Sequence, residues 1–277
     1  MNLDAASILL SALFAGIVAT AVTVAIEKWG GLVGGLLGTV PSTIVPAGIG
    51  MYVAGGEDVL ILSMAVVPLG MLLNALFLGA WVVIPRWIPN APYLLLLTTI
   101  GALAFWTFLG MAFLVLVDEL MSDFGVQGFA VGGLCLLIIT AVVFNRRPQP
   151  TPKGTNKVST LVLVARGTMA ATAIGIAVGL SGLGFPTLAG LASVFPAIFL
   201  TSMVALWLAQ GPTVPQGAAG PMMLGGASVA VYANLAIWSL PAYGALLGSL
   251  IAWVGSVVGW SLPAFMVLRK HHASVND

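Results

Sequence analysis

The chain has 277 residues, of which 60% are hydrophobic and only 6% are charged, and its mean hydropathy is +1.12. Soluble domains carry about 25% charged residues, so the composition excludes a soluble globular fold and predicts an all-α polytopic membrane protein. The short alternating segments of transmembrane barrels are missing. A net charge of +1 gives no reason to expect a nucleic-acid partner.

Windows of about 20 apolar residues predict about nine membrane spans. The first span follows Asp4 rather than a basic region and has no clear cleavage site, so we expect it to be retained and not removed as a signal peptide. A polar, proline-rich stretch at 145–157 divides the chain into two halves. The expected spans are 5–26, 31–53, 59–84, 93–117, 125–145, 158–180, 187–209, 219–240 and 243–268.

Charge placement supports this span count, because alternating spans put basic and acidic residues on opposite sides of the membrane. The basic side receives Lys28, Arg86, Arg146, Arg147, Lys153, Lys157, Arg269 and Lys270. The other side receives Asp4, Glu57, Asp58, Asp118, Glu119 and Asp123, with no lysine or arginine. The positive-inside rule then predicts an outside N-terminus and a cytoplasmic C-terminus. This bias suits a bacterial inner membrane, with a eukaryotic organelle as the alternative.

The spans 31–53 and 187–209 resemble each other at a constant offset of about 155 residues, which pairs Pro41 with Pro196. Each span carries a proline and a Ser/Thr cluster in its first half. A proline removes a backbone hydrogen bond and crowds the carbonyl one turn earlier in the helix. In lipid, such a defect is tolerated only where protein or a water-filled cavity satisfies the freed groups. We therefore expect both spans to be broken helices.

The similarity extends over four spans on each side of a linking fifth span, and an odd number of crossings then separates the two copies. The sequence therefore predicts an inverted repeat of four spans, a linker span and four spans. The expected units are 1–117, a linker helix with a cytoplasmic loop at 118–157, and 158–277. Small residues recur at every fourth position in the first and sixth spans, which predicts close helix packing there.

Motifs for enzymatic chemistry are missing, including H-E-x-x-H, the nucleophile elbow and the P-loop. His271 and His272 lie in a polar tail, and the single Cys135 has no cysteine partner. We expect no enzyme activity, no catalytic residue, no cofactor and no metal site.

The candidate substrate-binding residues are prolines and neutral polar residues at membrane depth, where inverted repeats commonly place their site. They are Thr39, Pro41, Ser42, Thr43, Pro46, Asn74, Ser193, Pro196, Thr201, Ser202 and Asn234. The alternative for each broken span is a simple kink whose freed carbonyl is bonded by a neighbouring hydroxyl. The alternative for the two asparagines is an interhelical hydrogen bond.

Arg166 is the one charge that interrupts a span, and a buried arginine is costly unless it is paired or snorkels to the interface. Snorkelling is the first interpretation, and pairing with a substrate anion or a counter-ion is the second. Glu27, at the end of the first span, is a candidate coupling carboxylate or the surface partner of Lys28 or Arg166.

The segment AGLASVFPAIFL at 189–200, followed by a glycine-rich span and a last span rich in small residues, weakly resembles the GlpM-type family of small four-span bacterial membrane proteins. A similar G-L-x-x-x-F-P segment occurs in that family. The resemblance covers about 80 residues, and the first half departs from it because Val40 stands at the position of Phe195. It implies a four-span building block, here duplicated and fused through a linking helix.

These features together predict a secondary transporter, or permease, for a small solute or ion that works by alternating access between two inverted repeats. Few buried ionisable groups favour uniport or sodium coupling over a proton relay. The alternatives are a channel, and a non-transporting subunit or assembly factor of a larger membrane complex. The expected partners are the lipid bilayer, the small solute or ion and, as an open alternative, a second copy of the chain in a homodimer.

Overall fold

The computed structural model describes residues 5–29, 40–146 and 159–276, with the side chains of 26–29 and 270–276 outside the description. Its described part is almost entirely helical and contains no strand. The helices are α1 (Ala5–Trp29), α3 (Ile44–Trp87), α4 (Leu94–Asn145), α5 (Thr160–Gly182), α6 (Pro186–Ser193), α7 (Ala197–Gln210), α8 (Thr213–Ser256), the π-helical turn η1 (Val257–Ser261) and α9 (Leu262–Asn276). The predicted all-α class is confirmed.

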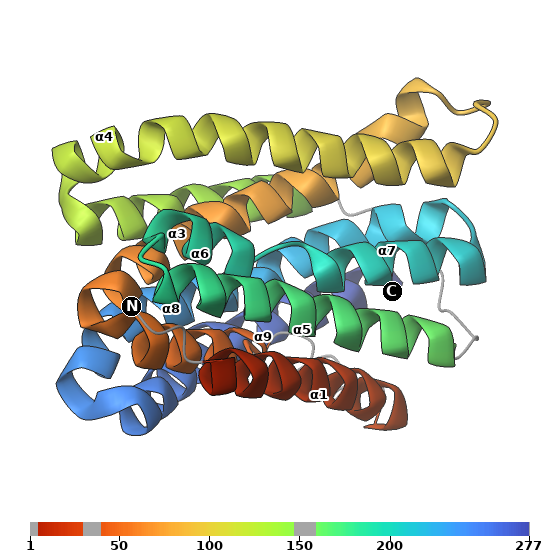
Figure 1. The fold of residues 1–277 in the computed structure, drawn as a ribbon. Helices are drawn as coiled ribbons and strands as arrows, with labels where there is room; N and C mark the ends of the chain where they lie inside the picture. The colour runs from red at the N-terminus through yellow and green to blue at the C-terminus, as the bar shows by residue number, and fades with distance from the viewer. Residues whose placement is uncertain (1–4, 30–39, 147–158, 277) are drawn as a thin grey trace.

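The helices form an elongated bundle in which α4 runs along one edge and α1 along the opposite edge (Figure 1). Between them, α3 packs against both α4 and α8. Among the described residues, six helical stretches are long and apolar enough to cross a membrane. Their exposed surface is rich in large apolar side chains, such as Phe108 and Val115. Such a bundle is consistent with an integral multi-pass membrane protein.

Three of the long helices contain one glycine each with a non-helical backbone. Gly56 in α3 has φ 80° and ψ −174°, Gly125 in α4 has φ 70° and ψ 158°, and Gly244 in α8 has φ 78° and ψ 172°. This region of backbone space is essentially restricted to glycine. Figure 1 shows α4 folding back beside itself at one end of the bundle. The glycines therefore divide each of these helices into two consecutive segments.

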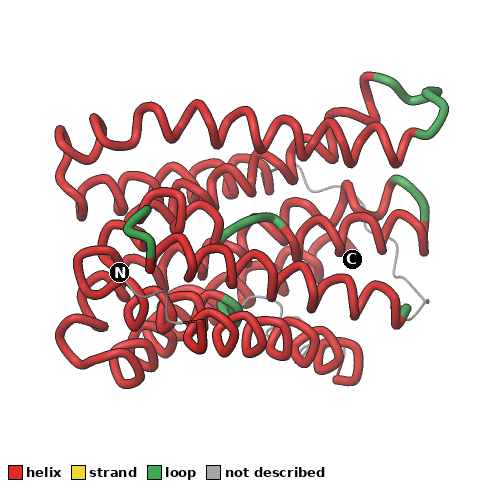
Figure 2. Tube along the Cα trace, in the orientation of Figure 1, coloured by secondary structure: helices red, strands yellow, loops and turns green. Residues whose placement is uncertain are grey.

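The stretch 187–209 is a broken helix, as predicted. The helix α6 ends at Ser193 and α7 begins at Ala197, so residues 194–196 form a loop that lies inside the bundle (Figure 2). Pro196 explains the break, because a proline disfavours helical geometry at the preceding residue and suits the start of the next helix. In the predicted span 31–53, residues 40–43 are non-helical and α3 begins at Ile44, while 30–39 lie outside the described residues.

The small residues of the first and sixth predicted spans face each other where α1 crosses α5. A Cβ atom added to Gly16 would lie 2.9 Å from the carbonyl oxygen of Gly167 and 3.2 Å from Cβ of Ala171. A Cβ atom added to Gly175 would lie 3.2 Å from Cβ of Ala12. The two backbones therefore approach as closely as the predicted packing requires.

Candidate functional site

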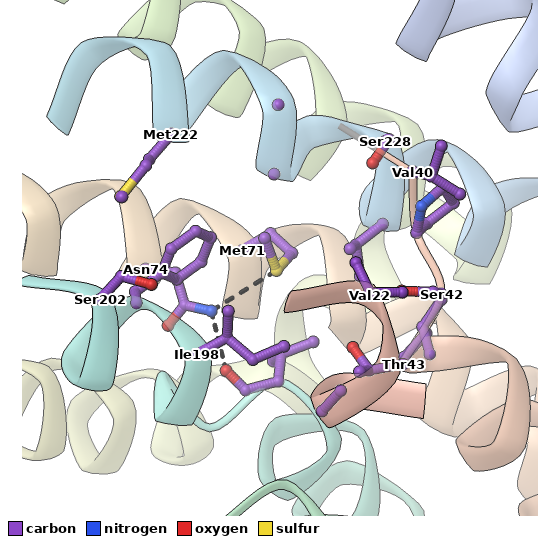
Figure 3. Close-up of a pocket in the computed structure, with 18 of the residues that line it drawn as sticks. Val22, Val40, Ser42, Thr43, Met71, Asn74, Ile198, Ser202, Met222 and Ser228 are labelled. Atoms are coloured by element: carbon purple, nitrogen blue, oxygen red, sulfur yellow. Dashed lines mark hydrogen bonds between the residues drawn. The ribbon is translucent and has the colours of Figure 1, made fainter. Parts of the chain in front are cut away.

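A cavity of about 280 Å³ lies in the middle of the bundle, between the two non-helical segments. Residues from α1, α3, α5, α7 and α8 complete its wall (Figure 3). Of the predicted site residues, seven line it: Pro41, Ser42, Thr43, Asn74, Arg166, Ser193 and Ser202. Residues far apart in the sequence thus meet at one place.

The second break is held by a buried hydrogen-bond chain. Asn74, only 2% exposed, donates from Nδ2 to the carbonyl oxygen of Val194 at 2.8 Å, which satisfies a backbone group that the break frees from helical bonding. Trp106 donates from Nε1 to Oδ1 of Asn74, also at 2.8 Å. The interhelical hydrogen bond expected as one alternative for Asn74 is therefore present. Its partner is a backbone carbonyl of the break, so Asn74 satisfies one particular group that the break frees.

Arg166 lies in the protein interior, with 8% of its surface exposed, and does not snorkel to the outside. Its guanidinium donates to the hydroxyl oxygens of Thr23 at 2.7 Å, Ser202 at 2.7 Å and Thr201 at 3.2 Å. The planar fork of arginine can reach several acceptors at once. Arg166 on α5 therefore connects α1 with α7 at the edge of the cavity.

Two of these hydroxyls also donate a hydrogen bond to the backbone of their own helix. Thr23 donates to the carbonyl oxygen of Ala19 at 2.8 Å, and Thr201 donates to that of Ala197 at 2.8 Å. Each hydroxyl can do both because it carries one donor and two acceptor lone pairs. These hydroxyls give the largely buried guanidinium three neutral hydrogen-bond acceptors, which offset part of the cost of burying its charge.

The first break has a simpler environment. Pro41 is buried, and Ser42 and Thr43 line the cavity, yet Thr43 makes no side-chain capping bond to the start of α3. The backbone amide of Ser42 donates to the carbonyl oxygen of Val40 at 2.9 Å. The expected kink capped by Ser42 or Thr43 is thus not among the described hydrogen bonds. Thr39 lies outside the described residues.

The remaining candidates do not line the cavity. Pro46 is buried within the first turn of α3, Pro196 is at the second break, and Thr201 stands behind Arg166. Asn234 lies elsewhere in α8 and donates to the carbonyl oxygens of Ala230 at 3.0 Å and of Ala130 on α4 at 3.4 Å. The interhelical hydrogen bond expected as one alternative for Asn234 is therefore present. For Glu27 the structure describes the backbone alone.

Sequence reasoning missed several apolar and small residues of the cavity wall, including Met71, Ile198, Phe199, Met222, Gly225 and Ser228. Side chains of these types look like ordinary core in a sequence. One signal was present, since the pair Leu69-Gly70 recurs as Leu224-Gly225 at the repeat offset. Gly70 packs against the side chain of Val194 and Gly225 lines the cavity. Both glycines of the recurring pair therefore lie beside the cavity region.

The cavity offers hydroxyls, one amide and one guanidinium within a mostly apolar wall. In the described part of the chain, no cluster of three or more histidine, cysteine or carboxylate side chains could hold a metal ion. Such a wall can solvate and orient a small molecule, and its described lining offers no nucleophile–base pair.

Comparison of the chain with protein-family models, with curated proteins and with solved structures finds no match. The resemblance of the second half to the GlpM-type family therefore stays a prediction.

Proposed function

We propose that the chain is a secondary transporter with nine membrane crossings arranged as an inverted repeat. Division of three of the six membrane-length stretches at Gly56, Gly125 and Gly244 supports nine crossings, although the segment of α3 before Gly56 is the second half of the expected span 31–53. The charge distribution then favours a cytoplasmic C-terminus and a bacterial inner membrane.

Backbone geometry at matching positions supports the repeat. Gly56 and Gly211 are aligned by the offset of about 155 residues, and both have φ near 80° with an extended ψ (80° and −174°; 86° and 177°). The helix that follows each proline break ends at one of these glycines. In addition, α1 and α5, the first helices of the two proposed copies, run antiparallel side by side (Figure 1). Antiparallel mates are what an inverted repeat produces.

The observation that carries the transport proposal is the cavity enclosed between the two breaks. A break at membrane depth leaves backbone groups and hydroxyls available to a solute, and inverted-repeat transporters place their site at such a position. Pro41 to Thr43 and Ser193 to Phe195 contribute to the same wall from opposite copies. Relative motion of the copies would therefore change access to one shared site. The hydroxyl-rich, mostly neutral lining favours uniport or sodium coupling.

A screen for thermal stabilisation of the purified protein, against ions, sugars, amino acids, nucleosides and organic anions, identifies the solute. A ligand at 100 times its Kd adds about 2.7 kcal/mol of stability, which a melting curve resolves. Flux of that solute is then measured in proteoliposomes. The test variant is Val229→Phe, which fills the cavity, and the control is Val254→Phe on the exposed side of the same helix α8.

We expect Val229→Phe to abolish both stabilisation and flux, and Val254→Phe to retain them. Equal flux in the two variants would contradict a route through this cavity. Flux that does not saturate and reaches channel rates would favour the channel alternative. A folded protein with no stabilising solute and no flux, which co-purifies with a specific partner, would favour the non-transporting subunit.

A further inference from the structure

A second hollow opens on the side of the bundle between α4, α5 and α6, with a volume of about 490 Å³. Apart from three threonines, its wall is apolar and includes Met111, Met169, Ala173 and Leu188. Met111 is 62% exposed, so the hollow reaches the outer surface. In a membrane this surface faces acyl chains, because it lies on membrane-length helices. We call this hollow the lateral groove.

The lateral groove and the central cavity share one lining residue. Phe195 lines both of them and is half-buried. Its ring meets the indole of Trp106 edge to face, with centroids 5.5 Å apart and an interplanar angle of 83°. Trp106 lines the groove, and its hydrogen bond to Asn74 fixes the indole from the cavity side. The aromatic pair therefore closes the groove at its inner end.

Phe195 is placed where a side chain can move without unwinding a helix. It lies in the loop between α6 and α7, and its amide donates to the carbonyl oxygen of Ala192 at 3.1 Å. Trp106, by contrast, lies within α4 and is held at its nitrogen. Of the two rings that close the groove, Trp106 is held by a hydrogen bond, whereas Phe195 can rotate about its side-chain torsions while its backbone stays in place.

The central cavity suits a molecule with two chemical ends. Phe195, Ile198, Phe199 and Val229 supply apolar wall, whereas Ser42, Ser193, Ser202 and Ser228 supply hydroxyls. A strongly hydrated solute would leave part of its hydrogen bonding unmet against the apolar side. A purely apolar molecule would leave the polar part of the wall unused, although Ser193 already donates to the carbonyl oxygen of Gly190 and Ser202 accepts from Arg166.

We propose that the transported solute is amphipathic, with an apolar body and one hydrogen-bonding end, and that it reaches the central cavity from the bilayer through the lateral groove. Phe195 swings away from Trp106 to admit it. The apolar body occupies the groove on entry, because the two spaces are continuous once Phe195 moves. This inference rests on the proposed transport function and names its substrate class and route.

The test uses a long-chain alkanol with a terminal diazirine as the probe, added to the whole protein in lipid nanodiscs. After photolysis, mass spectrometry reports labelled residues in the cavity, such as Met71 and Met222, with and without excess unlabelled alkanol. Ala173→Phe fills the groove, and Thr172→Phe fills its mouth as a second blocking variant. Val164→Phe, on the exposed side of the same helix α5, is the matched control. Melting curves verify that each variant is folded.

We expect competable labelling of the cavity that falls several-fold in Ala173→Phe or Thr172→Phe, stays unchanged in Val164→Phe and rises in Phe195→Ala. Wild-type labelling in both folded blocking variants would overturn the lateral route. An unlabelled cavity, even in Phe195→Ala, together with flux of a water-soluble solute would overturn the substrate class and leave transport standing. Groove-dependent labelling without flux of any solute would uphold the site and overturn transport.

Discussion

The two non-helical segments face one cavity, yet polar side chains hold them very differently. At the second break, Asn74 binds the carbonyl oxygen of Val194, and Arg166 binds hydroxyls on the following helix. At the repeat offset, the position of Asn74 is occupied by Val229 and that of Arg166 by Ser11. For residues 40–43, the described side-chain hydrogen bonds include no comparable cap from another helix. The described side chains therefore hydrogen-bond the second non-helical segment more extensively than the first.

Two segments at matching positions of the proposed repeat can therefore differ in how strongly side chains hold them. A break whose carbonyl is bonded by a buried amide opens only if that bond is lost. In the proposed transport cycle, the backbone of residues 194–196 would therefore act as a fixed wall of the cavity. Substitutions can test the side-chain hydrogen bonds at the second break and the backbone symmetry separately.

The largest expected effect comes from Asn74→Leu, which keeps side-chain size but removes both hydrogen bonds of the cap. The indole nitrogen of Trp106 and the carbonyl oxygen of Val194 then lose their partner. An unsatisfied buried polar group costs about 1–3 kcal/mol, so the free energy of unfolding should fall by about 2–4 kcal/mol. Equilibrium unfolding in detergent, followed by tryptophan fluorescence, measures the loss.

Asn234→Leu is the matched control, because both asparagines were predicted site residues at membrane depth. Asn234 donates to the carbonyl oxygen of Ala230 in its own helix at 3.0 Å and, at a longer 3.4 Å, to that of Ala130 on α4, and its Oδ1 finds no hydrogen-bond partner among the described residues. Replacing it should change stability by less than about 1 kcal/mol. An equal loss in both variants would show that Asn74 acts by general polarity and not as the cap of the break.

The next effect tests symmetry of the backbone through Gly56→Ala and Gly211→Ala. No atom lies within 4 Å of a Cβ added at either position, so the cost is conformational strain alone. Holding a residue other than glycine in this region costs about 1–3 kcal/mol, and similar geometry predicts similar losses. Gly132→Ala in α4 has equal open space without positive φ and should be neutral or stabilising by up to about 1 kcal/mol. Melting temperatures of the three variants measure these losses of stability. Strongly unequal losses at Gly56 and Gly211 would contradict the backbone symmetry of the proposed repeat.

Much of this architecture follows from local chemistry that a sequence displays. Pro41 and Pro196 predict breaks because a proline acts on its own and the preceding residues wherever the helix lies. The small-residue stripes predict the contact of α1 with α5 because close approach needs small side chains on both helices. The single-residue turns at Gly125 and Gly244 were not singled out, since glycine is frequent throughout this chain, with 34 occurrences.

The hydrogen bonds of Asn74 and Arg166 could not be predicted, because they join residues far apart in the sequence. Asn74 and Val194 are 120 positions apart, and Arg166 and Thr23 are 143 apart. For Arg166, reach along a single helix suggested snorkelling, whereas a neighbouring helix supplied acceptors closer than the interface. For Asn234 the sequence left a binding site and an interhelical hydrogen bond open, and the side chain donates to Ala130 on α4 as well as to Ala230 in its own helix.

The smallest effect tests the Arg166 fastening through a pair of threonines on α1. Thr20 and Thr23 each donate a hydroxyl hydrogen bond four residues back along the helix, and of the two, Thr23 also accepts one from Arg166, at 2.7 Å. Hydrogen bonds to charged groups are worth about 1.5–3 kcal/mol, but the guanidinium keeps its bonds to Thr201 and Ser202, so Thr23→Val should cost about 1 kcal/mol. Thr20→Val removes a hydroxyl of otherwise similar bonding and should be close to neutral. In an Arg166→Lys background, where one ammonium replaces the planar fork, the difference between the two valine variants should shrink. A difference that persists there would show that Thr23 stabilises α1 without Arg166, and the hydrogen bond between Arg166 and α1 would then add no stability.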